Sequence, residues 1–204
     1  MKTTDIYEKA WAGKHGDEYT KRCDVDFESR IDIFGWLLDE LDIGMISRIL
    51  EVGCNKGHNL SSLQALTHYS IIGAGLEINK SLCVAPGIVN GTIYDIPWSD
   101  NVFDIVFSSG VLIHIPPKRL DDAIKEMRRA SNKYILMIEY HADVEKGFRY
   151  EEDFDHGDGC WHRPYGKIYE SLFPKDKLIK SGKISDLGDD GWAFSKCNYW
   201  VYEK

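Results

Sequence analysis

Apolar positions along the chain alternate between short continuous runs and stretches with helical spacing. The runs within 49–52, 71–76, 88–93, 103–107 and 133–140 have the length of strands, and their continuous apolar character is typical of buried ones. Apolar residues recur every three or four positions over 27–41, 58–66 and 116–130, which predicts helices. Strands that alternate with helices indicate an α/β fold with a mainly parallel sheet.

The pattern changes after residue 140. Residues 141–168 follow neither period and mix polar and aromatic side chains with glycines. Irregular segments of this length are uncommon inside compact domains and are often functional, so we predict a lid over the substrate here. Residues 178–184 and 199–202 are predicted as two further strands, and the aromatic and charged residues within 1–26 as an N-terminal cap.

Composition and charge narrow the class of protein. The 204 residues fit one domain, and 43% hydrophobic with 28% charged residues is typical of a soluble globular protein. The net charge of −8 disfavours a nucleic-acid partner, because such partners are bound by phosphate neutralisation. No apolar run approaches the roughly 20 residues of a membrane helix, and residues 1–5 lack a signal-peptide core, so we expect a cytoplasmic protein.

The five cysteines stand far apart at positions 23, 54, 83, 160 and 197, without a Cys-x-x-Cys pair. This spacing favours free thiols over a disulfide framework or a zinc site, and no metal site is expected.

The most informative chemistry lies in residues 48–57. An apolar strand carrying Glu51 breaks into a loop bounded by Gly53 and Gly57, and a helix follows. A dinucleotide fingerprint that began at Gly53 would need glycine at positions 55 and 58, where Asn55 and His58 stand. The acid at position 51 would repel a pyrophosphate but suits a cationic ligand.

This acid-x-Gly-x-x-x-Gly pattern resembles motif I of class I S-adenosylmethionine-dependent methyltransferases, whose cofactor carries a sulfonium and an ammonium group. The resemblance implies a Rossmann-like fold: a mostly parallel seven-stranded sheet with helices on both faces and an antiparallel C-terminal strand. It also implies that Asp95 receives the adenine amino group. Glu77, 26 residues after Glu51, would accept the ribose hydroxyls, a role that nicotinamide-binding folds share.

A closer resemblance is to the pseudaminic acid biosynthesis-associated methylases. Its motifs are Trp11-Ala12-Gly13-x-x-Gly16-Asp17-Glu18-Tyr19-x-x-Arg22, Asn55-x-Gly57-x-Asn59-Leu60, Tyr94-Asp95-Ile96-Pro97 and Val111-Leu112-Ile113-His114-Ile115. Similar small enzymes methylate phosphonates, so the resemblance implies O-methylation of a small anionic metabolite, either a sugar acid such as a nonulosonate or a phosphonate or phosphate ester. The cofactor-binding residues that it implies are Trp11, Tyr19, Arg22, Glu51, Gly53, Cys54, Asn55, Gly57, Asn59, Glu77, Ile78, Asp95, Ile96, Ser109 and Gly110.

His114 is the candidate catalytic residue. Methyl transfer to a hydroxyl requires an aligned acceptor and removal of a proton, and a histidine that titrates near neutrality suits a general base. The structural alternative is a histidine at a helix start, bonded to backbone near Pro116.

Arg163, Tyr165 and Lys167 form a cation–aromatic group within the predicted lid. Because arginine binds carboxylates and phosphates through a planar fork, we interpret this group as an anion clamp that closes on the acceptor, with Tyr19 on the opposite side. The alternative is a set of salt bridges from these cations to Glu151, Glu152 or Asp153 that stabilise the lid.

Two other classes of function stay open at this point. A nicotinamide-dependent oxidoreductase would bind NAD(H), and a non-catalytic partner subunit would bind S-adenosylmethionine without turnover. We expect a monomer or homodimer that acts on a small molecule.

Overall fold

The computed structural model describes residues 6–22, 27–39, 41, 43–149, 159–187 and 196–204. Within these residues no helix has the length and apolar character that crossing a membrane requires.

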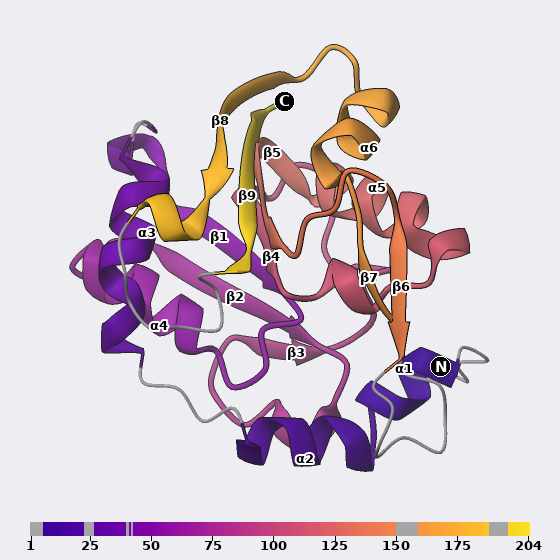
Figure 1. Cartoon of the computed structure of the whole chain (residues 1–204). Helices are drawn as coiled ribbons and strands as arrows, with labels where there is room; N and C mark the ends of the chain where they lie inside the picture. The colour runs from indigo at the N-terminus through magenta and orange to yellow at the C-terminus, as the bar shows by residue number, and fades with distance from the viewer. Residues whose placement is uncertain (1–5, 23–26, 40, 42, 150–158, 188–195) are drawn as a thin grey trace.

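A seven-stranded sheet in the order β3-β2-β1-β4-β5-β9-β8 forms the centre of the molecule (Figure 1). The strands are β1 (Arg48–Val52), β2 (Ile72–Glu77), β3 (Ile88–Asn90), β4 (Phe103–Ser109), β5 (Ser131–Glu139), β8 (Lys177–Lys183) and β9 (Asn198–Glu203). Neighbours from β3 through to β5 pair in parallel, and β9 is antiparallel to both β5 and β8. The predicted fold class is therefore confirmed, including the antiparallel C-terminal strand.

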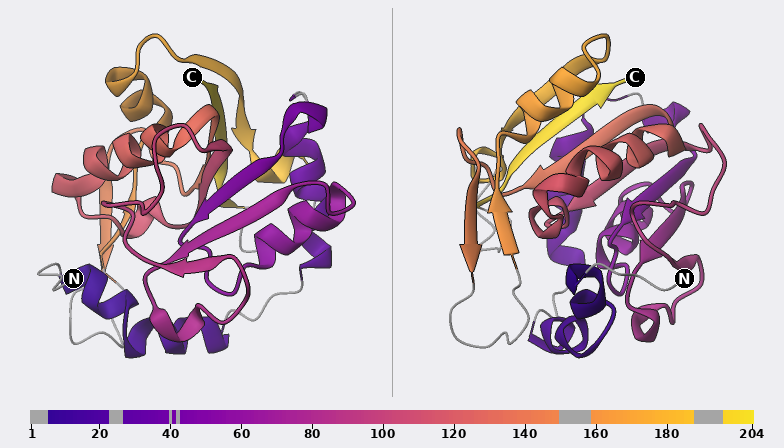
Figure 2. Two further views of the ribbon diagram at one scale, coloured as in Figure 1. Left: turned by 180° about the vertical axis from the view of Figure 1, so that it is seen from behind. Right: turned by 90° about the vertical axis from the view of Figure 1, so that its right-hand side faces the viewer.

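Helices cover both faces of this sheet (Figures 1 and 2). The α-helices are α3 (Ile31–Leu38), α4 (His58–Leu66), α5 (Leu120–Ala130) and α6 (Tyr165–Leu172), with α1 (Ile6–Trp11) and α2 (Lys14–Arg22) at the N-terminal end. The short 3₁₀ helices are η1 (Glu28–Arg30), η2 (Ile43–Met45), η3 (Lys80–Leu82), η4 (Leu112–His114), η5 (Pro117–Arg119) and η6 (Ile184–Asp186).

Each face has its own core. On one side α3 and α4 pack on the sheet, where the rings of Phe34 and Phe107 meet edge to face at 5.7 Å. On the other side α5 buries Ile124 and Met127 completely. The acids in its first turn and the arginines in its last turn complement the helix dipole. The apolar stripes that predicted these helices are thus the faces that pack on the sheet.

The segment 141–168 differs from its prediction. β6 (Lys146–Arg149) and β7 (Gly159–His162) form an antiparallel hairpin, and α6 begins at Tyr165, so the interpretation as an irregular insert is wrong for these stretches. Gly159 is there for close packing, since a Cβ atom would lie 2.0 Å from the Trp161 ring. Residues 151–153, the alternative salt-bridge partners, lie outside the described residues.

The strand order places a crevice at one edge of the sheet. From β1 the sheet grows outward in one direction to β2 and β3, and the chain then returns to add β4 on the other side of β1. Ligands of open α/β sheets bind at this switch point, beyond the carboxyl ends of the strands. In Figure 1, α1 and α2 lie across this end of the sheet, and the β6–β7 hairpin reaches down toward α1.

Candidate active site

A cavity of about 410 Å³ lies at the carboxyl ends of β1, β2 and β4, under α1 and α2. Its volume is in the range of sites for small molecules and cofactors. The predicted site residues that line it are Trp11, Tyr19, Arg22, Glu51, Gly53, Cys54, Asn55, Asn59, Glu77, Ile78, Ser109, Gly110 and His114.

The glycine loop takes a left-handed backbone at three positions, with φ of 72° at Gly53, 51° at Asn55 and 83° at Gly57. Gly53 could not carry a side chain, because a Cβ atom would lie 2.6 Å from the Val111 side chain. Gly57 does not line the cavity and instead precedes α4 as its N-cap residue. The loop thus places Gly53, Cys54 and Asn55 at the cavity wall.

Glu77 holds the loop from the end of β2. Its two carboxylate oxygens each accept a backbone N–H at 2.8 Å, one from Asn55 and one from Asn79. Burial raises the pKa of Glu77, while these hydrogen bonds oppose the shift. The carboxylate is therefore fixed at the cavity wall, where its remaining lone pairs could accept hydroxyl protons.

Glu51 lies deeper, only 2% exposed. Asn59 donates to one of its oxygens at 2.5 Å, while Oε2 has no hydrogen-bond partner. Burial raises the pKa of this carboxyl to about 8. Arg30 donates to Asn59 and also lines the cavity, so a guanidinium stands beside the buried acid. Sequence reasoning missed Arg30, because its place within a helical stretch carries no signal of the contact.

The N-terminal cap is fastened over the glycine loop by polar contacts. Asn55 donates to Thr20 of α2 at 2.8 Å, Asn79 donates to Asp17 at 2.9 Å, and Thr92 donates to Glu8 of α1. At Gly16 in α2, a Cβ atom would come within 2.1 Å of the Trp11 carbonyl oxygen and 3.0 Å of Asn79. This glycine therefore lets the cap lie close to the end of β2.

His114 ends the η4 turn that follows β4, and its ring contacts Trp11 with centroids 4.4 Å apart. The Gly159 backbone carbonyl accepts a hydrogen bond from the ring, whereas Nδ1 is buried without a partner. Burial lowers the pKa of His114 to about 3, so the expectation of titration near neutrality is wrong. The ring is neutral at physiological pH. With its N–H on Nε2, directed at Gly159, it presents a lone pair on Nδ1.

Two buried charged residues hold the η4 turn from opposite ends. Glu139, at the end of β5, accepts the backbone N–H groups of Val111, Leu112 and Ile113 and the Ser108 hydroxyl. Burial raises its pKa to about 7. Sequence reasoning missed Glu139, although an acid that ends an apolar strand is the signal that had singled out Glu51.

Arg163 binds the other end of the turn. Its guanidinium donates to the carbonyls of Leu112 at 3.0 Å and Ile115 at 2.8 Å, and its Nε donates to Glu145 at 2.6 Å. The Arg163 side chain is 0% exposed and does not line the cavity.

The predicted anion clamp is therefore corrected. The Arg163 guanidinium donates to the η4 turn, and the buried Tyr165 donates its hydroxyl proton to the Trp161 carbonyl. Lys167 is exposed on α6. None of the three lines the cavity. Arg163 and Tyr165 are buried in the core, and Lys167 is exposed to solvent.

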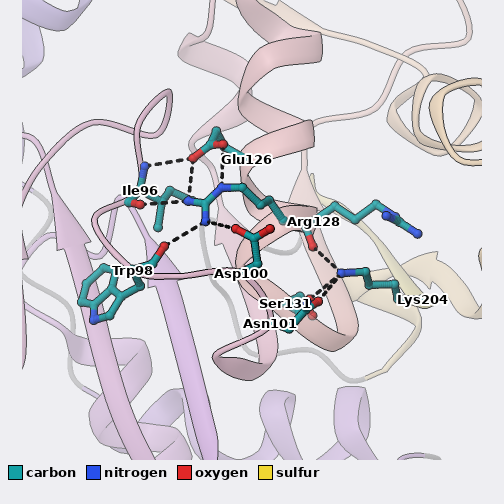
Figure 3. A network of polar contacts seen from close by, with 9 residues as sticks. Ile96, Trp98, Asp100, Asn101, Glu126, Arg128, Ser131 and Lys204 are labelled. Atoms are coloured by element: carbon teal, nitrogen blue, oxygen red, sulfur yellow. Dashed lines mark hydrogen bonds and ion pairs between the residues drawn. The ribbon is translucent and has the colours of Figure 1, made fainter.

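Asp95 and Ile96 also lie off the cavity wall. Asp95 is exposed. The Ile96 backbone N–H donates to Glu126 of α5, as Figure 3 shows, and the Ile96 carbonyl accepts from Arg129. This network extends to Trp98 and Asp100 and ties the segment after β3 to α5. The residues that line the cavity here are Gly91, Thr92, Ile93 and Tyr94, a few positions earlier than predicted.

The sequence of residues 50–133 matches the family model described as "Methyltransferase domain". This span contains the glycine loop, Glu77 and the η4 turn with His114. Over this span the chain is similar to methyltransferase domains. The observed strand order, and the cavity at the carboxyl ends of β1, β2 and β4, fit such a domain. The matched residues include those that resemble motif I of class I methyltransferases. The match is to this general domain and does not identify the pseudaminic acid-associated subfamily.

Solved structures with the same fold include methyltransferases of several kinds. One is 1,6-didemethyltoxoflavin-N1-methyltransferase from Burkholderia thailandensis, with a TM-score of 0.68 at 11% identity, covering 98% of this chain and 87% of that one. Another is magnesium protoporphyrin IX methyltransferase from Synechocystis PCC 6803, with a TM-score of 0.65 at 12% identity, covering 100% and 99%. At these identities the likeness establishes the fold.

Among curated proteins, the chain is similar to 24-methylenesterol C-methyltransferase 2 from Arabidopsis thaliana. The two are 23% identical over 166 residues, which cover 74% of this chain and 44% of that protein. The chain therefore spans less than half the length of that relative.

Proposed function

We propose that this protein transfers the methyl group of S-adenosylmethionine to an oxygen atom of a small molecule, with His114 as the general base. The observation that carries the proposal is the pairing of two unpartnered buried atoms on one cavity: Glu51 Oε2 and His114 Nδ1. The first suits the cofactor's ammonium, and the second suits an acceptor's proton.

The residues present fit the cofactor. Glu51 offers an orphaned carboxylate oxygen to a cation, and Arg30 beside it offers donors to a carboxylate. Glu77 offers fixed carboxylate oxygens at the end of β2, and apolar side chains of Leu76 and Ile78 line the wall around it. When bound, S-adenosylmethionine supplies an electrophilic methyl group on a sulfonium with a neutral leaving group.

The chain's own residues supply alignment and proton transfer. Trp11 packs against His114 and, with Tyr19, walls the cavity from the cap side, which orients the acceptor and excludes water. His114 takes the hydroxyl proton on Nδ1, and the Gly159 carbonyl then stabilises the imidazolium through the opposite N–H.

The comparisons support a small-molecule acceptor. The two named structural neighbours are methyltransferases of 1,6-didemethyltoxoflavin and of magnesium protoporphyrin IX, and a third is a mitomycin 7-O-methyltransferase. Cytoplasmic location and a monomeric or homodimeric state stay predictions.

An anionic acceptor, whether a sugar acid, a phosphonate or a phosphate ester, is the second candidate. Its predicted clamp lies elsewhere, but Arg22 lines the cavity and has no ion pair among the described residues. Arg22 is thus the residue that would carry this alternative.

Calorimetric titration with S-adenosylmethionine and with NADH, followed by a labelled-methyl transfer assay over small-molecule acceptors, tests the proposal. We expect one site for S-adenosylmethionine, no binding of NADH, and turnover that His114→Gln reduces. Binding of NADH would support an oxidoreductase instead. Cofactor binding without transfer to any acceptor would support a non-catalytic partner subunit.

A further inference from the structure

The side of the cavity next to His114 has a different chemical character from the side that faces Glu51 and Glu77. Its lining residues include Tyr7 and Trp11 of α1, Tyr19 of α2, and Val111 and Ile115 around η4. Trp11 contacts the rings of both His114 and Tyr19, at 4.4 and 5.1 Å between centroids. A cavity side lined by these aromatic and aliphatic groups favours a ligand with a flat or apolar body.

The His114 ring faces this side of the cavity as a hydrogen-bond acceptor. The carbonyl of Gly159 fixes the N–H of the His114 ring on the nitrogen that faces the hairpin, so the free Nδ1 can only accept. The hydroxyl of Ser109, also at the wall and buried without a partner, can both donate and accept. A ligand that satisfies Nδ1 must therefore bring a proton.

Positive charge is scarce here. Among the described residues that line the cavity, the arginines and lysines are Arg22 and Arg30. Arg30 is bonded to Asn59 beside Glu51, and Arg22 lies at the exposed end of α2. The guanidinium nearest to the η4 turn, that of Arg163, donates to two carbonyls and Glu145. An anion brought against His114 would lose its water without gaining a charged partner, which is strongly unfavourable.

We propose that the methyl acceptor is an uncharged molecule with a flat ring that donates a hydroxyl proton to Nδ1 of His114. This inference rests on the proposed function and names the substrate class for the same site. In the reaction the hydroxyl oxygen forms a bond to the methyl carbon while the carbon–sulfur bond breaks. The electron pair of that bond stays on sulfur, giving a neutral thioether, and the hydroxyl proton moves to His114. Phenolic and enolic hydroxyls are the simplest members of this class.

The test uses ring probes of similar size and different charge on the full chain saturated with S-adenosylhomocysteine. Phenol and catechol represent the proposed class, and benzoate and phenylphosphonate represent ionised acceptors. We expect calorimetry to show that the neutral probes bind at least about tenfold more tightly than the ionised ones. His114→Gln, which keeps a polar group directed at Gly159 but lacks the acceptor at Nδ1, should lose that preference while its affinity for S-adenosylhomocysteine stays unchanged.

Trp11→Leu is the second variant, should His114→Gln not fold, and it should weaken all ring probes alike. Lys167→Ala, exposed on α6, is the matched control and should behave as the wild type. Tighter binding of benzoate or phenylphosphonate, equal binding of all probes, or binding of none at millimolar concentration overturns the inference. If S-adenosylhomocysteine binds in those cases, the proposed function stands, whereas absence of cofactor binding overturns both. An anion preference that Arg22→Gln removes would establish the anionic alternative.

Discussion

The cofactor side and the acceptor side of the cavity are built by contacts of different range. On the cofactor side, Asn59 binds Glu51 across 8 residues and Asn55 binds Glu77 across 22. On the acceptor side, Arg163 binds Leu112 across 51 residues, and Glu139 binds the same turn across 27. A motif can encode the first kind of contact, because neighbouring strand ends meet at one edge of the sheet. The second kind depends on how β5 and the hairpin pack on η4.

The largest expected effect comes from breaking the acceptor side at His114. His114→Gln should lower turnover by about 10²–10⁴-fold, the usual contribution of a general base, while cofactor affinity stays within about twofold. Because a base works in its neutral form and burial lowers the pKa of His114 to about 3, wild-type turnover should not fall as pH drops from 7 to 5. Steady-state kinetics across this range check both points.

The control for this variant is His68→Asn, since His68 is exposed, lies off the cavity and has a left-handed backbone that Asn tolerates. A drop in wild-type rate with midpoint near pH 6.5 would contradict the neutral, buried base.

The cofactor side is tested by Glu77→Ala. Loss of hydrogen bonds to a charged group, about 1.5–3 kcal/mol, should weaken S-adenosylmethionine by roughly 10- to 150-fold in calorimetry. Asp95→Asn is the sharper comparison, because the sequence motif assigns it to the cofactor whereas the structure places it outside the cavity. We expect its affinity to stay within about twofold of wild type, since surface substitutions usually have small effects. A loss as large as that of Glu77→Ala would restore the motif-based assignment.

Arg163→Met tests whether Arg163 stabilises the fold or binds the acceptor. It leaves the carbonyls of Leu112 and Ile115 unpaired, so unfolding should become easier by at least about 1.5–3 kcal/mol. For a chain of this size that corresponds to a melting temperature lower by roughly 3–12 °C. Lys167→Ala should change stability by no more than about 0.5 kcal/mol. Normal stability of Arg163→Met with a raised KM for the acceptor would revive the anion clamp.

The smallest effect concerns the pH dependence of stability. The pKa of Glu51 is raised to about 8 and that of Glu139 to about 7 in the folded state, so above pH 6.5 the folded chain holds more protons than the unfolded chain. Stability should therefore fall as pH rises from 7 to 8, a window in which His114 is mostly neutral in both states. Thermal unfolding of the cofactor-free protein should show this slope, and Glu51→Gln should flatten it. A rise in stability over the same window would contradict it.

These contrasts explain which parts could be predicted from the sequence. Apolar runs and helical spacing predicted the sheet and the helices α3, α4 and α5, because the apolar residues of each element are those buried in the core. The glycine loop and Glu77 were predicted because the chemistry of a strand end is local. The functions of Arg163 and Glu139 were not predicted, since a charged residue looks the same in sequence whether it faces a ligand or a buried turn. The hairpin was missed because its packing depends on glycines that lie against an aromatic ring, as Gly147 of β6 lies opposite Trp161 of β7.

The attachment of the cap has a consequence for how ligands enter and leave. α1 buries none of its side chains, and α2 buries only Gly16 and Thr20, so the cap adds little to the hydrophobic core. Its partners include polar groups at Asn55, Asn79 and Thr92, together with ring contacts from Tyr7 to Trp161 and from Trp11 to His114. Segments held in this way open in local fluctuations that cost far less than global unfolding. In the free protein, amide hydrogens of residues 6–22 should thus exchange much faster than those of β1 and β4. Bound cofactor should slow them selectively, because the opening that exposes those amides is also the path to the cavity.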